Sequence, residues 1–246
     1  MSSLKIRKEE LAENPTTRLP ICLVLDTSYS MEGEPITELN EGVKIFMEEL
    51  LNHEIAKYSA EVAVITFGNT AFSKPGDRDP KSGVKKILDF GSIEKQKIPT
   101  LTSGGYTPMG EAVELALEML SDVKDLYRTQ GVEYYQPWVV LMTDGKPYDG
   151  RSNNFQSVDA ISVKTCELIN NKKLTIFPIG ITSPDLSLDI LKRFSPKFDP
   201  LRLKGLKFKE FFVWLSQSVA KASESLPGEK INLDMEEAKK WTVDLG

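Results

Sequence analysis

The chain has 246 residues, of which 40% are hydrophobic and 27% charged, and this composition excludes intrinsic disorder and fibrous proteins. With 31 Lys and Arg against 36 Asp and Glu, the formal charge of -5 disfavours nucleic-acid binding through an overall positive field. One histidine and two cysteines are too few for a polyhistidine or four-cysteine zinc site or a disulfide scaffold, and they make a Ser-His-Asp triad improbable.

The N-terminal sequence is charged and lacks the apolar core of a secretory signal, and no apolar run approaches the ~20 residues of a membrane span. We therefore expect a soluble, cytoplasmic protein that does not contact membranes. Residues 1–18 are predicted to form an N-terminal arm, residues 19–226 one domain and residues 227–246 a charged C-terminal tail.

The first predicted strand is the near-continuous apolar run of residues 20–25, which is typical of a parallel strand covered on both faces. Apolar residues three and four apart then predict an amphipathic helix that begins near Pro35. A second buried strand covers residues 61–67, with a short antiparallel hairpin partner at residues 71–73. Residues 74–106 show no strong period and are predicted to be largely irregular.

The remaining chain continues the alternation of helices and strands. Thr107 is the predicted N-cap of the next helix, and Pro108 is its first helical position. Strands follow at 138–143, 174–179 and 200–203, and helices at 158–168, 187–194 and 207–221. Such alternation predicts an open, doubly wound, Rossmann-like α/β fold with a mostly parallel sheet and helices on both faces.

The C-terminal tail carries four apolar side chains whose place the sequence leaves open. They are suited either to the surface of the domain or to a partner. These residues are Ile231, Leu233, Met235 and Trp241.

Oxygen-bearing side chains follow the first predicted strand. In an extended chain the period of two places Asp26, Ser28 and Ser30 on one side. One carboxylate and two hydroxyls, with no nitrogen or sulfur, suit a hard divalent cation such as Mg2+ better than zinc or copper. Thr107, at a helix start after two glycines, and Asp144, after the strand at 138–143, add two more oxygens.

Each of these residues also has an ordinary interpretation as a turn or capping residue. Ligands of open α/β sheets bind outside the carboxyl ends of the strands, and two of the three segments follow a strand while the third begins a helix. Their occurrence together, in this order, favours a metal site.

Three stretches, LPICLVLDTSYSM, GGYTPMGEAVELAL and VVLMTDGKP, resemble the three parts of the metal-ion-dependent adhesion site of von Willebrand factor A domains. The resemblance runs from about residue 19 to 221 and implies a six-stranded sheet with one short antiparallel edge strand. It implies that an acidic side chain of a protein partner completes the coordination of Mg2+, with Mn2+ or Ca2+ as alternatives. The metal ligands that it implies are Asp26, Ser28, Ser30, Thr107 and Asp144.

Within this family, the stretch EELAENPTTRLPICLVLDTS looks similar to a bacterial tellurite-resistance-associated subgroup. This likeness implies a cytoplasmic adaptor linked to a protein kinase or a protein phosphatase. Tyr29 stands where the family commonly has glycine, so it is expected at the rim of the site. The candidates for partner contact are Tyr29, Tyr106 and Lys146.

The sequence therefore predicts a metal-dependent protein-interaction module without catalysis. A Mg2+-dependent phosphoryl-transfer enzyme is the main alternative, but Ser28 occupies the position where such enzymes need a second carboxylate. No phosphate-binding glycine motif follows the first strand, and His53 is assigned no role.

A basic cluster offers a third alternative, the binding of nucleic acid or phosphate, although such clusters are usually solvated surfaces. Its members are Lys192, Arg193, Lys197, Arg202, Lys204, Lys207 and Lys209.

Overall fold

The computed structural model describes residues 3–68, 83–148, 155–226, 229, 231 and 233–243. Its centre is a six-stranded sheet of order β3-β2-β1-β4-β5-β6, in which only β3 is antiparallel to its neighbour. The strands are β1 (Leu19–Asp26), β2 (Ala60–Phe67), β3 (Val84–Leu88), β4 (Trp138–Thr143), β5 (Thr175–Gly180) and β6 (Leu201–Arg202). The predicted α/β fold class is confirmed.

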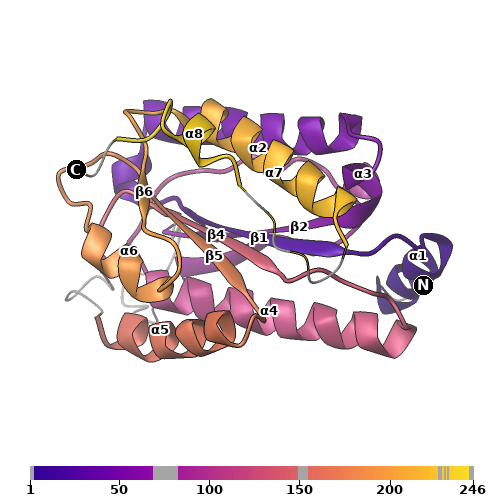
Figure 1. The fold of residues 1–246 in the computed structure, drawn as a ribbon. Coiled ribbons are helices and arrows are strands. Elements are labelled where there is room, and N and C mark those ends of the chain that lie inside the picture. The colour runs from indigo at the N-terminus through magenta and orange to yellow at the C-terminus, as the bar shows by residue number, and fades with distance from the viewer. Residues whose placement is uncertain are drawn as a thin grey trace.

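Helices cover both faces of this sheet (Figure 1). One face is covered by α2 (Glu34–Asn52), α3 (Ala56–Ser59), α7 (Phe208–Glu224) and α8 (Met235–Ala238). The other face is covered by α4 (Met109–Gln130), α5 (Phe155–Asn170) and α6 (Leu188–Phe194). Every residue of β1, β2 and β4 is buried, which explains why their sequences are nearly continuous apolar runs.

The strand register aligns the carboxyl ends of the parallel strands at one edge of the sheet. Asp26 is opposite Phe67, Thr143 is opposite Gly180, and Gly180 is opposite Arg202. The loops that leave β1, β4 and β5 therefore start side by side, in the place where open α/β sheets bind their ligands.

The antiparallel edge strand is β3, within the segment that was predicted to be largely irregular, and that prediction missed this strand. The predicted hairpin partner at residues 71–73 lies outside the described residues. Strand β3 has the sequence VKKIL, with three consecutive exposed residues, so it lacks the apolar alternation of a core strand. Charged lysines are typical of edge strands, where they oppose pairing with other chains.

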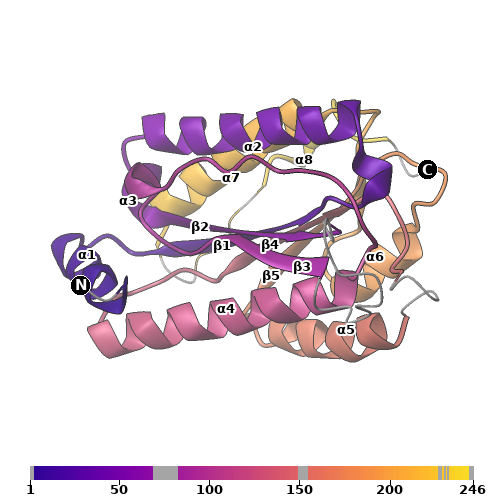
Figure 2. The ribbon, with the colours of Figure 1, turned by 180° about the vertical axis from the view of Figure 1, so that it is seen from behind.

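The connection from β3 to α4 runs beside α2 (Figure 2). The amide of Asn40 fixes it, because this side chain donates to the carbonyl of Leu101 and accepts from its N–H at 2.9 and 2.7 Å. Helix α4 begins at Met109, and its N-cap is Pro108 without a side-chain cap. The prediction that Thr107 is the N-cap is therefore wrong by one residue.

Both terminal segments contribute to the packed structure. Residues Ser3–Glu13 form α1, and Leu11 of this helix is buried in the core beside α4. In the tail, Trp241 is buried against Phe211 and Trp214 of α7, at ring-centroid distances of 5.4 and 5.5 Å. Ile231 and Leu233 pack on the same core, whereas Met235 is exposed, so the domain itself holds most of these apolar side chains.

Among the described residues, no helix is long and apolar enough to cross a membrane.

Candidate metal centre

Asp26 is fully buried at the end of β1, and hydrogen bonds orient both of its carboxylate oxygens. The backbone N–H of Ser28 donates to Oδ1 at 2.8 Å, and the hydroxyl of Thr143 donates to Oδ2 at 2.5 Å. Thr143 is the last residue of β4, which is paired with β1, so the sheet itself places this donor.

The two serines connect Asp26 to the loop after β4. The hydroxyls of Ser28 and Ser30 are 3.1 Å apart, and the Ser30 hydroxyl donates to Oδ1 of Asp144 at 2.8 Å. Four of the five predicted ligands thus form one hydrogen-bonded group drawn from positions more than 110 residues apart in the chain.

The loop that carries Thr107 is bonded to both of the other segments. Gly104 N–H donates to the carbonyl of Thr27 at 2.7 Å, and Tyr29 N–H donates to that of Gly105 at 3.2 Å. Thr107 exchanges two backbone hydrogen bonds, of 2.9 and 3.1 Å, with Tyr148 beyond the Asp144 turn. Thr107 itself is buried, and because Pro108 is the N-cap, its hydroxyl does not cap the helix.

A close backbone approach supports the segment of Asp26 and Ser28 from the β2 side. Thr27 donates both its N–H and its hydroxyl to the carbonyl of Phe67, at 2.8 and 3.1 Å. Gly68 follows with φ of +123°, and a Cβ at this position would lie 2.3 Å from the nitrogen of Ser28. Only glycine fits this position without displacing the backbone of the candidate site.

The electrostatics of the site favour a bound cation. Burial, and to a smaller extent the charge of Asp144, raise the pKa of Asp26 to about 7, although the hydrogen bonds from Ser28 and Thr143 lower it. Burial also raises the pKa of Asp144, despite the hydrogen bond from Ser30. In the described part of the chain no cationic side chain is bonded to either carboxylate, so these two buried groups oppose their own ionisation, and a divalent cation would relieve this cost.

The donor set fits a hard cation. The described residues contain no group of three or more His, Cys, Asp or Glu side chains suited to hold a metal ion. The candidate centre instead offers two carboxylates and three hydroxyls, all of them oxygen ligands, which suit Mg2+, Ca2+ or Mn2+.

Aromatic side chains surround the candidate centre. Tyr29 is 72% exposed and Tyr106 49% exposed, and both belong to its loops. Tyr148, which is 38% exposed, packs edge-on against Tyr106 with ring centroids 5.5 Å apart. The sequence reasoning missed Tyr148, although its position four residues after Asp144 was a usable signal. Lys146 of the same loop is also exposed.

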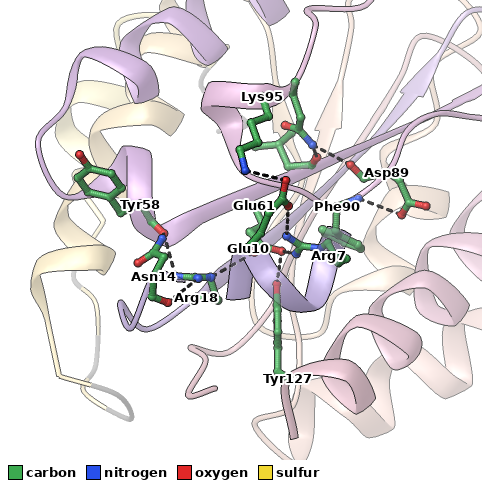
Figure 3. Close-up of polar contacts among 12 residues, drawn as sticks. Arg7, Glu10, Asn14, Arg18, Tyr58, Glu61, Asp89, Phe90, Lys95 and Tyr127 are labelled. Atoms are coloured by element: carbon green, nitrogen blue, oxygen red, sulfur yellow. Dashed lines mark hydrogen bonds and ion pairs between the residues drawn. The ribbon is translucent and has the colours of Figure 1, made fainter. Parts of the chain in front are cut away.

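A second polar cluster, which the sequence reasoning missed, lies at the opposite end of the parallel strands, near the starts of β1 and β2. Figure 3 shows its polar contacts. Its centre is Glu61, which is buried and bonded to Arg7 of α1, to Arg18 at 3.2 Å and to the Tyr127 hydroxyl at 2.6 Å. Lys95 joins it through Glu10 at 3.1 Å. The ion pairs of Arg7 with Glu61 and of Lys95 with Glu10 attach α1 to the domain.

His53 also has a structural explanation. It is the C-cap of α2, and its Nδ1 accepts from the N–H groups of Ile55 and Ala56 at 3.3 and 3.2 Å.

The family model for the von Willebrand factor type A domain matches residues 21–197, and the chain belongs to this family. No sequence among the curated proteins matches the chain.

Solved structures share the fold at low sequence identity. The pilus adhesin SpaC from Lactobacillus rhamnosus GG is 17% identical with a TM-score of 0.60, over 85% of this chain and 31% of that protein. The vWF domain of the pilus tip protein Mfa5 from Porphyromonas gingivalis is 14% identical with a TM-score of 0.58, and the match covers 87% of this chain and 98% of that domain. Manganese-loaded TRAP protein from Plasmodium vivax is 16% identical with a TM-score of 0.52, and the match covers 81% of this chain and 73% of that chain. The chain thus spans less than a third of the SpaC adhesin.

Proposed function

We propose that this chain is a protein-interaction module whose binding depends on a divalent cation held by Asp26, Ser28, Ser30, Thr107 and Asp144. The observation that carries the proposal is the hydrogen-bonded group of oxygen ligands, in which Asp26, Ser28 and Asp144 are buried and the pKa values of both carboxylates are raised. Mg2+ is the first candidate, with Mn2+ and Ca2+ as alternatives, and the manganese-loaded TRAP protein shares the fold.

The protein side chains prepare the site for an anionic ligand. Thr143 and Ser28 N–H fix the orientation of the Asp26 carboxylate, and Ser30 does the same for Asp144. The bound cation would supply an electrophilic centre that retains exchangeable ligands, because Mg2+ keeps several waters unless an anionic oxygen replaces one. An Asp or Glu of the partner is such an oxygen, and the exposed Tyr29, Tyr106 and Lys146 offer contact area around it.

The proposed module has no catalytic activity. A phosphoryl-transfer enzyme of this architecture needs a general acid two residues after Asp26, and Ser28 cannot serve in that role. Incubation of the purified protein with Mg2+ and para-nitrophenyl phosphate tests this point. Turnover that disappears in Asp26→Asn would overturn the proposal.

Nucleic-acid binding by the basic cluster finds little support. Four of its seven members pair with carboxylates within the chain, so more than half of the positive charge is compensated, and two others donate to backbone carbonyls. A surface of paired charges does not release the counterions that drive binding to nucleic acids.

Isothermal titration with MgCl2 and MnCl2 tests the metal site. We expect saturable binding in the native chain and none in Asp26→Ala, with a matched control, Asp122→Ala, that behaves as native because Asp122 is exposed on α4. In thermal unfolding, metal at 100 times its Kd should stabilise the native chain by about 2.7 kcal/mol. Equal binding by Asp26→Ala and the native chain would contradict the assignment.

The finer part of the proposal is an adaptor role in a bacterial stress system of the tellurite-resistance type, with a kinase or phosphatase as partner, in the cytoplasm. This role is supported by the stretch EELAENPTTRLPICLVLDTS, which resembles the tellurite-resistance-associated subgroup of the family. Affinity capture with and without EDTA, comparing the native chain with Asp26→Ala, tests for such a partner, and cell fractionation tests the location. The proposed division into residues 1–18, 19–226 and 227–246 is tested by limited proteolysis.

A further inference from the structure

A pocket of about 460 Å³ lies beside β6, at the same edge of the sheet as the candidate metal centre. Six residues between Ser183 and Asp189, in the segment that leads from β5 into α6, line it together with Arg202. The polar lining groups are the hydroxyls of Ser183 and Ser187, the guanidinium of Arg202 and the exposed carboxylate of Asp189.

Arg202 differs from the other members of the basic cluster. Lys192, Arg193, Lys207 and Lys209 pair with carboxylates, and Lys197 and Lys204 donate to backbone carbonyls. In the described part of the chain, Arg202 has no ion pair, and its Nε is buried without a hydrogen-bond partner. A buried donor that lacks a partner costs about 1 to 3 kcal/mol, more when it is charged, so this group is suited to a ligand from outside.

The pocket is close to the candidate metal centre. Thr143, Gly180 and Arg202 form one row across β4, β5 and β6, so the Cα atoms of Thr143 and Arg202 are separated by two strand spacings, about 10 Å. The charge of Asp185, in the loop that lines the pocket, acts on Asp144 of the metal centre. A ligand that reaches the metal centre can therefore also reach Arg202.

From this geometry we infer that Arg202, Ser183 and Ser187 form a second anion-binding subsite, which takes a carboxylate group. A guanidinium presents a planar fork of N–H donors that matches a carboxylate, and the two hydroxyls add neutral donors. Asp189 adds a negative charge to the lining, which favours a singly charged carboxylate over a phosphate dianion. We identify this carboxylate as a second acidic side chain of the protein partner whose first acidic side chain binds the metal centre. This identification of its source rests on the proposed function.

Nuclear magnetic resonance of the arginine Nε–H groups tests the subsite directly. The native chain is titrated at constant ionic strength with glutarate, a tetraglutamate peptide and inorganic phosphate, and Arg202→Gln assigns the signal. We expect saturable shifts of the Arg202 signal with glutarate and the peptide, at concentrations on the order of tenfold below those that shift Arg128. Arg128 is the matched control, because it is exposed and already paired with Asp125 at 2.7 Å. Ser183→Ala/Ser187→Ala should weaken the Arg202 response severalfold.

Parallel shifts of Arg202 and Arg128, or a response to phosphate alone, would overturn the inference. Peptide binding that tightens with Mg2+ in the native chain, but not in Asp26→Ala, would support a protein source for the carboxylate. Equal responses to glutarate and to the peptide, unaffected by Mg2+, would support a free dicarboxylate at the same subsite. Because Asp26→Ala leaves Arg202 in place, loss of metal binding with an intact Arg202 response separates a failure of the metal site from a failure of this subsite.

Discussion

At the scale of single residues, Asp26 destabilises the metal-free folded protein and, for the same reason, favours the binding of a cation. Its carboxylate is fully buried, and the charge of Asp144 acts on it. Such burial opposes ionisation and favours the capture of a cation.

We expect Asp26→Asn to stabilise the metal-free protein while it abolishes metal binding. The amide can keep the hydrogen bonds to Ser28 N–H and Thr143 but carries no charge to bury. One pKa unit corresponds to about 1.4 kcal/mol, so the gain at pH 8 should reach a few kcal/mol. Urea unfolding in EDTA measures it, with Asp122→Asn as an exposed control. A less stable Asp26→Asn protein at pH 8 would show that the charge is compensated in another way.

The same shift predicts a pH dependence of stability. Because the folded-state pKa of Asp26 is raised to about 7 from 3.8, the folded protein binds more protons than the unfolded chain between these values. The contribution of Asp26 to stability is therefore fully present below about pH 4 and lost as the pH rises through about 7. In EDTA, the difference in unfolding free energy between Asp26→Asn and the native chain should grow from pH 5 to pH 8. A constant difference would contradict this prediction.

At the scale of elements, the loop after β1 depends on the close approach of the end of β2. We expect Gly68→Ala to destabilise the protein by on the order of 3 kcal/mol and to weaken metal binding, because its Cβ would meet the backbone of Ser28. Gly131→Ala is the matched control, since φ there is also positive, at +68°, but nothing lies within 4 Å of the added Cβ. The control should cost about 1 kcal/mol and leave metal binding unchanged. Equal losses in both variants would show that only backbone strain matters.

The elements also show where local sequence patterns are informative. Strands β1, β2 and β4 were predictable because burial on both faces demands apolar runs. Strand β3 was not, because an edge strand needs only a pairing partner, and its lysines point to solvent. The start of α4 at Met109 was missed by one residue, since capping preferences do not fix a helix end when tertiary bonds hold Thr107.

At the scale of the whole molecule, the buried cluster around Glu61 joins α1, β2 and α4. Glu61→Ala would leave the guanidinium groups of Arg7 and Arg18 without their buried counter-charge, and we expect a loss of about 3 to 5 kcal/mol. The control Glu210→Ala breaks the half-exposed pair with Lys207 and should cost about 0 to 1 kcal/mol. Urea unfolding of both variants makes the comparison. Similar small losses in both would show that α1 and the cluster contribute little to the domain.

The sequence by itself determined the fold class, the five parallel strands, the helices α2, α4, α5, α6 and α7, and the five candidate ligands. These follow from short-range periodicity and from residue chemistry at strand ends and a helix start. Only the tertiary structure decided that Ser30 bonds to Asp144, that Thr143 orients Asp26 and that Trp241 returns to α7. It also placed Arg202, one residue of a basic cluster, in a row with Thr143. Such contacts join residues that are distant in the chain, and they depend on strand order and register, which local patterns do not encode.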